Sequence, residues 1–129
     1  MLSEPGAFDP SDLVAACRSG ATLNLELLHE ILGYFIRQNR GRMMDARRAL
    51  DADDRSQLAE TAHAVKGSAA LVGAKRLSLL AYELELDAPL ATPGVLRSRV
   101  DAIQREYDAV VRTLSIEHPE ALAEPPEAV

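Results

Sequence analysis

The stretch LAETAHAVKGSAALVG, Leu58–Gly73, decides which fold this sequence favours. Apolar residues recur in it at spacings of three and four, which is typical of a helix with one buried face. This stripe consists of Leu58, Ala62, Val65, Ala69 and Val72. Because a helix advances about 100° per residue, His63 lies roughly 200° around from Val65. We therefore predict a helix that buries one face, presents a histidine to solvent on the other, and stops at a left-handed Gly73.

Gly67 interrupts this helix one turn after His63. Inside a helix, a glycine costs about 1 kcal/mol relative to alanine. Lys66 and Gly67 share the exposed face with His63, and the other residues near the imidazole are small. We expect Gly67 to provide steric clearance beside the ring, where a partner surface can dock; the alternative is close packing between helices. The candidate docking residues are Ala59, Ala64 and Ala70.

Composition narrows the class of protein. The 129 residues suggest one domain, and 47% apolar but only 4% aromatic residues favour a core of packed helices built from aliphatic side chains. The net charge of −6 argues against nucleic acid as a partner, because phosphate binding needs a basic surface. A single cysteine, Cys17, excludes an internal disulfide and a cysteine-based zinc site. No apolar run approaches the ~18 residues of a membrane span and no signal sequence is evident, so we expect no membrane contact and a cytoplasmic location.

Three further stretches carry a helical period, at residues 23–54, 74–87 and 93–114. Residues 9–20 are typical of a short helix that Gly20 would end. No stretch predicts a strand. Four substantial helices joined by short connections indicate an antiparallel bundle.

The predicted fold is therefore all-α. It is an antiparallel up-down four-helix bundle over residues 8–115, with a short accessory N-terminal helix. Residues 116–129 are acidic and contain proline, and we expect them to form a tail that packs little.

An exposed imidazole beside a lysine suits the chemistry of a phosphoryl carrier. With a reference pKa of about 6.5, a histidine is mostly neutral at pH 7 and can act as a nucleophile. Lys66, one turn from His63, can offset the charge of about −2 on a phosphoryl group. A point charge on a flexible stem suits this role, because it must serve both the phosphorylated and the free state.

The spacing of these residues resembles the signature of histidine-containing phosphotransfer (HPt) domains. That signature reads His, two residues, Lys-Gly, five residues, Gly, three residues, Leu. The matching positions are His63, Lys66, Gly67, Gly73 and Leu77. The helical layout is also similar over roughly residues 10–115. The resemblance implies a four-helix bundle with one phosphorylatable histidine, here His63.

The resemblance also implies partners. Such domains exchange a phosphoryl group with aspartates of receiver domains, and some accept it from the ATP-binding domain of a kinase. The expected partners are therefore receiver domains of response regulators or of hybrid histidine kinases, which supply Mg²⁺ and most catalytic groups. We expect a monomeric phosphocarrier module with no cofactor of its own, rather than an enzyme.

Glu85 comes twenty-two residues after His63, on the next predicted helix. The family often has Gln or Glu at this place. In members that resemble the phosphotransfer domain of the chemotaxis kinase, a Glu there accepts the Nδ1–H bond and leaves Nε2 as the nucleophile. The resemblance thus assigns Glu85 the orientation of His63, and the alternative is a plain surface charge.

Other functions remain open from the sequence. The first alternative is a helical adaptor that binds a receiver or kinase domain without carrying phosphate, with His63 as an ordinary exposed histidine. The second is a small metal-dependent hydrolase. His29, His63 and His118 lie far apart in the chain and lack metal-ligand spacing, so we expect no metal site.

Overall fold

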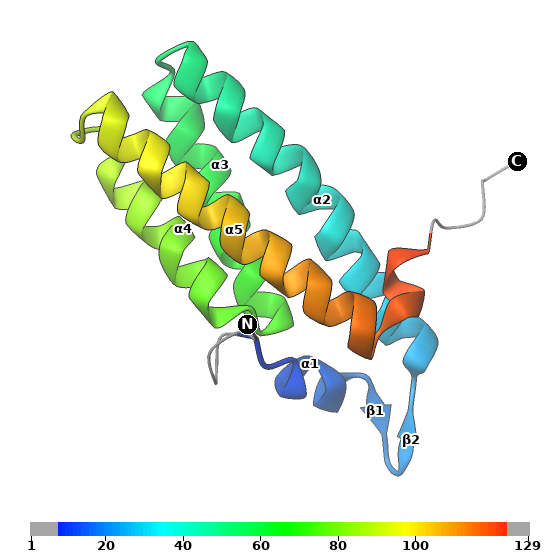
Figure 1. Ribbon diagram of the computed structural model, residues 1–129. Coiled ribbons are helices and arrows are strands. Elements are labelled where there is room, and N and C mark those ends of the chain that lie inside the picture. Colours follow the sequence, from blue (N-terminus) through cyan, green and yellow to red (C-terminus); the bar gives the residue numbers. More distant parts are fainter. Residues whose placement is uncertain (1–7, 124–129) are drawn as a thin grey trace, which may run out of the picture.

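The computed structural model describes residues 8–123. Four long helices in this part of the chain lie side by side and alternate in direction (Figure 1), which confirms the predicted antiparallel bundle. They are α2 (Leu25–Asp51), α3 (Arg55–Val72), α4 (Lys75–Asp87) and α5 (Pro93–Glu117). The short accessory helix is α1 (Ser11–Ala16). Within the described residues, no helix is both long and apolar enough to cross a membrane.

Polar side chains cap the starts of three long helices. Asn24 accepts a hydrogen bond from the backbone N–H of Leu27 at the start of α2, and Asp54 accepts one from Gln57 at the start of α3. Thr92 does the same for α5. Each cap satisfies an N–H that the first turn of a helix leaves without a partner. The helices therefore begin where the sequence offers a short polar side chain.

Gly73 ends α3 with a φ of 85°, the left-handed conformation that the sequence predicts. The backbone N–H of Asp9 donates a hydrogen bond to the Gly73 carbonyl over 2.8 Å. A Cβ at position 73 would collide with the Asp9 carbonyl oxygen. Glycine is therefore required here twice, once for its φ and once for the close approach of the N-terminal segment.

The core contains residues from every long helix, and the predicted stripe of α3 lies within it. Leu58, Ala62, Val65, Ala69 and Val72 are each at most 1% exposed. Buried polar bonds fix α3 and α5 against α2. Asn39 donates from Nδ2 to the Phe35 carbonyl and to Ser68 Oγ on α3, and the Tyr107 hydroxyl donates to the Ile36 carbonyl. Because buried polar groups need such partners, these bonds set how α3 and α5 lie against α2.

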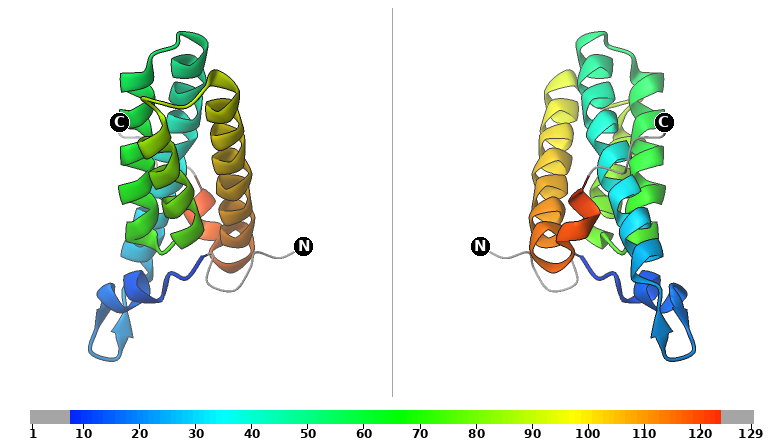
Figure 2. Two further views of the ribbon diagram at one scale, coloured as in Figure 1. Left: turned by 90° about the vertical axis from the view of Figure 1, so that its left-hand side faces the viewer. Right: turned by 90° about the vertical axis from the view of Figure 1, so that its right-hand side faces the viewer.

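The N-terminal region differs from its prediction. The helix expected up to Gly20 ends at Ala16, and a small antiparallel hairpin follows, in which β1 (Arg18–Ser19) pairs with β2 (Thr22–Leu23). Gly20 has a φ of 61° and makes the turn of this hairpin instead of ending the helix. Both views in Figure 2 place α1 and the hairpin at the end of the bundle where α3 meets α4.

The region after α5 packs more closely than a free tail. Helix α5 continues to Glu117, and a 3₁₀ helix, η1 (Pro119–Leu122), follows it. Ala121 of η1 is only 3% exposed, and its carbonyl oxygen lies 2.8 Å from where a Cβ of Gly33 would stand. The missing side chain at position 33 thus leaves room for this turn against α2. Residues 124–129 of the expected tail lie outside the described part of the chain.

Candidate functional site

His63 lies in the middle of α3, on the face opposite the buried stripe. Its side chain is 67% exposed. The 3.6-residue period of the helix places it there, since Ala62 and Val65 on either side of it in the sequence are both 1% exposed. The imidazole is therefore available to a partner molecule while its helix stays anchored in the core.

One carboxylate on α4 joins the histidine and the lysine. Glu85 Oε2 lies 3.0 Å from Nδ1 of His63, and Lys66 Nζ donates a hydrogen bond to Glu85 Oε1 over 2.8 Å. The structure thus brings together three residues that the sequence analysis singled out, although they come from two helices. The two helices are close neighbours along their length, which makes this contact a consequence of bundle packing.

The electrostatics of the cluster keep Glu85 ionised. The hydrogen bond from Lys66 has the largest effect and lowers the pKa of the Glu85 carboxyl below its usual value. Desolvation opposes this in part, and the bond to His63 lowers the pKa by a smaller amount. An ionised carboxylate only accepts hydrogen bonds, so the proton between Glu85 and His63 belongs on Nδ1. In that tautomer, Nε2 carries the lone pair. The cluster therefore leaves one imidazole nitrogen available as a nucleophile.

Gly67 is exposed one turn after His63. Apart from its chain neighbours and the backbone of its own helix, a Cβ added there would meet no atom of the described residues within 4 Å. Within residues 8–123, no neighbouring helix lies close enough to require a glycine at position 67. The three small candidates around it differ in exposure: Ala70 is exposed, whereas Ala59 and Ala64 are half-buried and Ala59 packs against the core.

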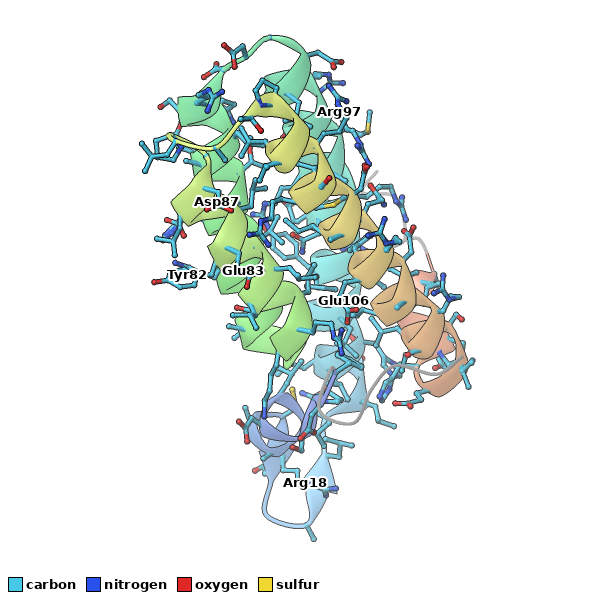
Figure 3. The ribbon with its side chains drawn as sticks, turned by 60° about the vertical axis from the view of Figure 1, so that its left-hand side comes forward. Arg18, Tyr82, Glu83, Asp87, Arg97 and Glu106 are labelled. Carbon is cyan, nitrogen blue, oxygen red and sulfur yellow. The ribbon has the colours of Figure 1, made fainter. Side chains whose placement is uncertain are left out.

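An apolar row lies beside the cluster and was not predicted from the sequence. Leu79, Tyr82 and Leu86 on α4 are 56%, 44% and 55% exposed. Figure 3 shows Tyr82 projecting outward from α4, and the Lys66 ammonium lies 5.1 Å from the centroid of its ring. The signal in the sequence is the spacing: Tyr82 precedes Glu85 by three residues and shares its side of the helix.

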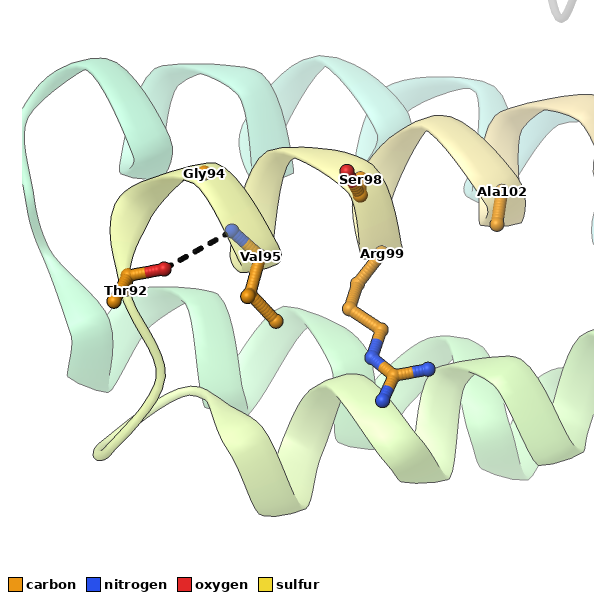
Figure 4. Close-up of a pocket in the computed structure, with 6 residues that line it drawn as sticks. All are labelled: Thr92, Gly94, Val95, Ser98, Arg99 and Ala102. Atoms are coloured by element: carbon orange, nitrogen blue, oxygen red, sulfur yellow. Dashed lines mark hydrogen bonds between the residues drawn. The ribbon is translucent and has the colours of Figure 1, made fainter.

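Other parts of the described chain give less evidence of a functional site. Among residues 8–123, no group of three or more His, Cys, Asp or Glu side chains could hold a metal ion. An open pocket of about 490 Å³ lies at the start of α5 (Figure 4). Its lining residues are Thr92, Gly94, Val95, Ser98, Arg99 and Ala102. The charged one, Arg99, already binds Glu83 and Asp87 on α4, so the pocket presents no unpaired charge to a ligand.

Comparison with known families gives a match over most of the bundle. Residues 30–113 match the model of the Hpt domain. This range runs from the first turns of α2 almost to the end of α5 and includes His63, Lys66 and Glu85. Comparison with curated proteins gave no match, and comparison with solved structures gave none either.

Proposed function

Because the chain belongs to the Hpt domain family, we propose that it is a phosphorelay intermediate that carries a phosphoryl group on His63. The family implies histidine phosphotransfer in phosphorelay signalling, partners among the receiver domains of two-component systems, and a carrier module rather than an ordinary enzyme. The observation that carries the assignment to His63 is its exposed ring, which Glu85 binds at Nδ1.

The proposed step follows from this geometry. The Nε2 lone pair of His63 attacks the phosphorus of an aspartyl phosphate on the receiver. A P–N bond forms, the P–O bond breaks, and the receiver recovers its aspartate carboxylate. The Nδ1 proton stays in place and its bond to ionised Glu85 stabilises the positive charge that the ring acquires. The reverse step returns the group to a receiver aspartate.

Lys66 is proposed to compensate the phosphoryl charge. Its ammonium lies one helical turn from His63 and is bound to Glu85 in the free protein. The lysine stem has rotatable bonds, so the ammonium can reach toward a phosphoryl oxygen without any change in the backbone. The ionic bond to Glu85 then supplies a resting position between transfers.

Gly67 is proposed to keep the approach to the ring clear for the partner. Receivers of response regulators or of hybrid histidine kinases would dock across Ala70, Ala64 and the exposed edge of Ala59. The partner would also supply Mg²⁺ and the remaining catalytic groups. We further propose that the protein acts as a monomer in the cytoplasm.

Labelling by a phosphorylated receiver tests this proposal. The expected product is an acid-labile, base-stable phosphoprotein, which His63→Gln abolishes with little change in melting temperature, because the side chain is exposed. His29→Gln and His118→Gln serve as matched controls and should label normally. Labelling that persists in His63→Gln would contradict the assignment, and stable receiver binding without any labelling would indicate the adaptor instead.

A further inference from the structure

Two side chains of α4 hold Lys66. Its Nζ donates to Glu85 Oε1 over 2.8 Å and lies 5.1 Å from the centroid of the Tyr82 ring. The ring and the carboxylate stand three residues apart on one side of α4, so both face α3. As a result, the Lys66 side chain is only 28% exposed, although it lies beside the exposed face of its helix.

The ion pair with Glu85 is not enough to explain why the Lys66 side chain is held against α4. A surface ion pair contributes little, because a long lysine side chain loses rotamer freedom when it is held. An aromatic face under the ammonium adds a second attraction and also covers apolar stem atoms. The ring of Tyr82 therefore adds an attraction that, together with the ion pair to Glu85, holds the Lys66 side chain in place.

We propose that Tyr82 is a positioning residue for phosphoryl transfer, which keeps the Lys66 ammonium against α4 and beside His63. This role rests on the proposed function of His63 and acts through Lys66 alone. The contact uses the face of the ring, so the hydroxyl is dispensable. Without the ring, the ammonium would spend more of its time in solvent, away from the phosphoryl group and from Glu85.

The contact itself is tested without any transfer reaction. An aromatic ring shifts the NMR signals of protons over its face upfield, so the Lys66 Hε signals should lie upfield in the wild type. The shift should disappear in Tyr82→Leu and persist in Tyr82→Phe. Tyr34→Leu replaces another exposed tyrosine, on α2, and should leave the signals unchanged. Equal Lys66 signals in wild type and Tyr82→Leu would overturn the contact and the proposal with it.

The functional role is tested by transfer from a receiver domain phosphorylated with acetyl phosphate. Tyr82→Leu should slow transfer about threefold, in line with an exposed cation–π contact, while Tyr82→Phe keeps the wild-type rate. In a Lys66→Met background, Tyr82→Leu should cause no further loss. Equal losses in both backgrounds would overturn the positioning role and indicate direct contact with the receiver. A wild-type chain that takes no label would overturn the proposed function itself, whatever the NMR signals show.

Discussion

Helix α4 meets its two neighbours through acids of one short run, YELELD, at Tyr82–Asp87. Toward α5, Glu83 and Asp87 accept hydrogen bonds from the guanidinium of Arg99, at 3.3 and 2.9 Å. Toward α3, Glu85 binds both Lys66 and Nδ1 of His63. Glu83 and Glu85, two positions apart, thus bind two different kinds of partner. Figure 3 shows Glu83 and Asp87 on α4.

The two faces of α4 differ in whether the residue that binds the carboxylate keeps a nitrogen atom that can react. Arginine is always charged and has no free nitrogen lone pair to react, so its two bonds to Glu83 and Asp87 only join the helices. Histidine has two nitrogens, and the carboxylate on α4 binds one of them. The second is left for chemistry. Both contacts use carboxylates of α4, so the acid does not distinguish them. The residue bound to the carboxylate does: the contact with His63 is a candidate reactive site, and the contact with Arg99 is not.

The largest expected effect is at Glu85. Glu85→Ala removes the acceptor for Nδ1–H, so the ring loses its fixed tautomer and transfer should slow about tenfold, as for other orienting carboxylates. The matched variant is Glu83→Ala, on the other face, which should keep the transfer rate. Transfer rates from a phosphorylated receiver provide the measurement, and equal slowing in the two variants would remove the distinction between the faces.

The next effect is at Lys66. Lys66→Met keeps the stem but removes the charge, so transfer should slow about three- to fivefold at low salt, the range of one exposed ionic contact. The loss should shrink as salt rises, because salt screens the lysine of the wild type. Transfer rates at low and high ionic strength check this. A rate that stays at the wild-type value under both conditions would make Lys66 an ordinary surface charge.

The opposite pattern is expected at Arg99. Arg99→Met should lower the free energy of unfolding by about 1 kcal/mol, since it removes a partly exposed contact to two carboxylates. Transfer should stay at the wild-type rate. Denaturant unfolding and the transfer assay, run on one preparation, separate the two quantities. Slowed transfer with unchanged stability would show that the α4–α5 face takes part in function.

The smallest expected change is at Gly67, where stability and transfer should move apart. Gly67→Ala should raise the free energy of unfolding by up to about 1 kcal/mol, because alanine favours the helix and a Cβ meets open space. Gly67→Gln should fold but transfer more slowly, since its atoms would stand beside His63. Melting temperature and transfer rate across Gly, Ala, Ser and Gln give the comparison. A rate that follows stability would contradict the role in steric clearance.

The long helices could be predicted from sequence because each buries one face, which leaves a clear period of apolar residues. The stripe of α3 is confirmed for this reason. The stop at Gly73 is confirmed for another, because glycine readily takes the left-handed conformation that ends a helix. The hairpin at Arg18–Leu23 could not be predicted, because strands of two residues are too short to show an alternating pattern. The packing of Ala121 against α2 was not predicted either, because it depends on the absence of a side chain at Gly33, far earlier in the chain.

The candidate site was predictable only in part. The position of His63 follows from helix geometry, whereas the choice of Glu85 required a family resemblance, because spacing along the chain does not reveal which residues meet across two helices. Tyr82 was missed for the same reason: an exposed aromatic residue on α4 has no visible relation to Lys66 until the helices are packed.

We propose that Nε2 of His63 carries the phosphoryl group while Glu85 binds the Nδ1–H group. The most direct measurement is a ¹⁵N NMR spectrum of the phosphorylated protein, in which coupling to ³¹P identifies the bonded nitrogen. We expect coupling at Nε2 of His63 and a retained proton on Nδ1. Coupling at Nδ1, or phosphorus on any other residue, would contradict it.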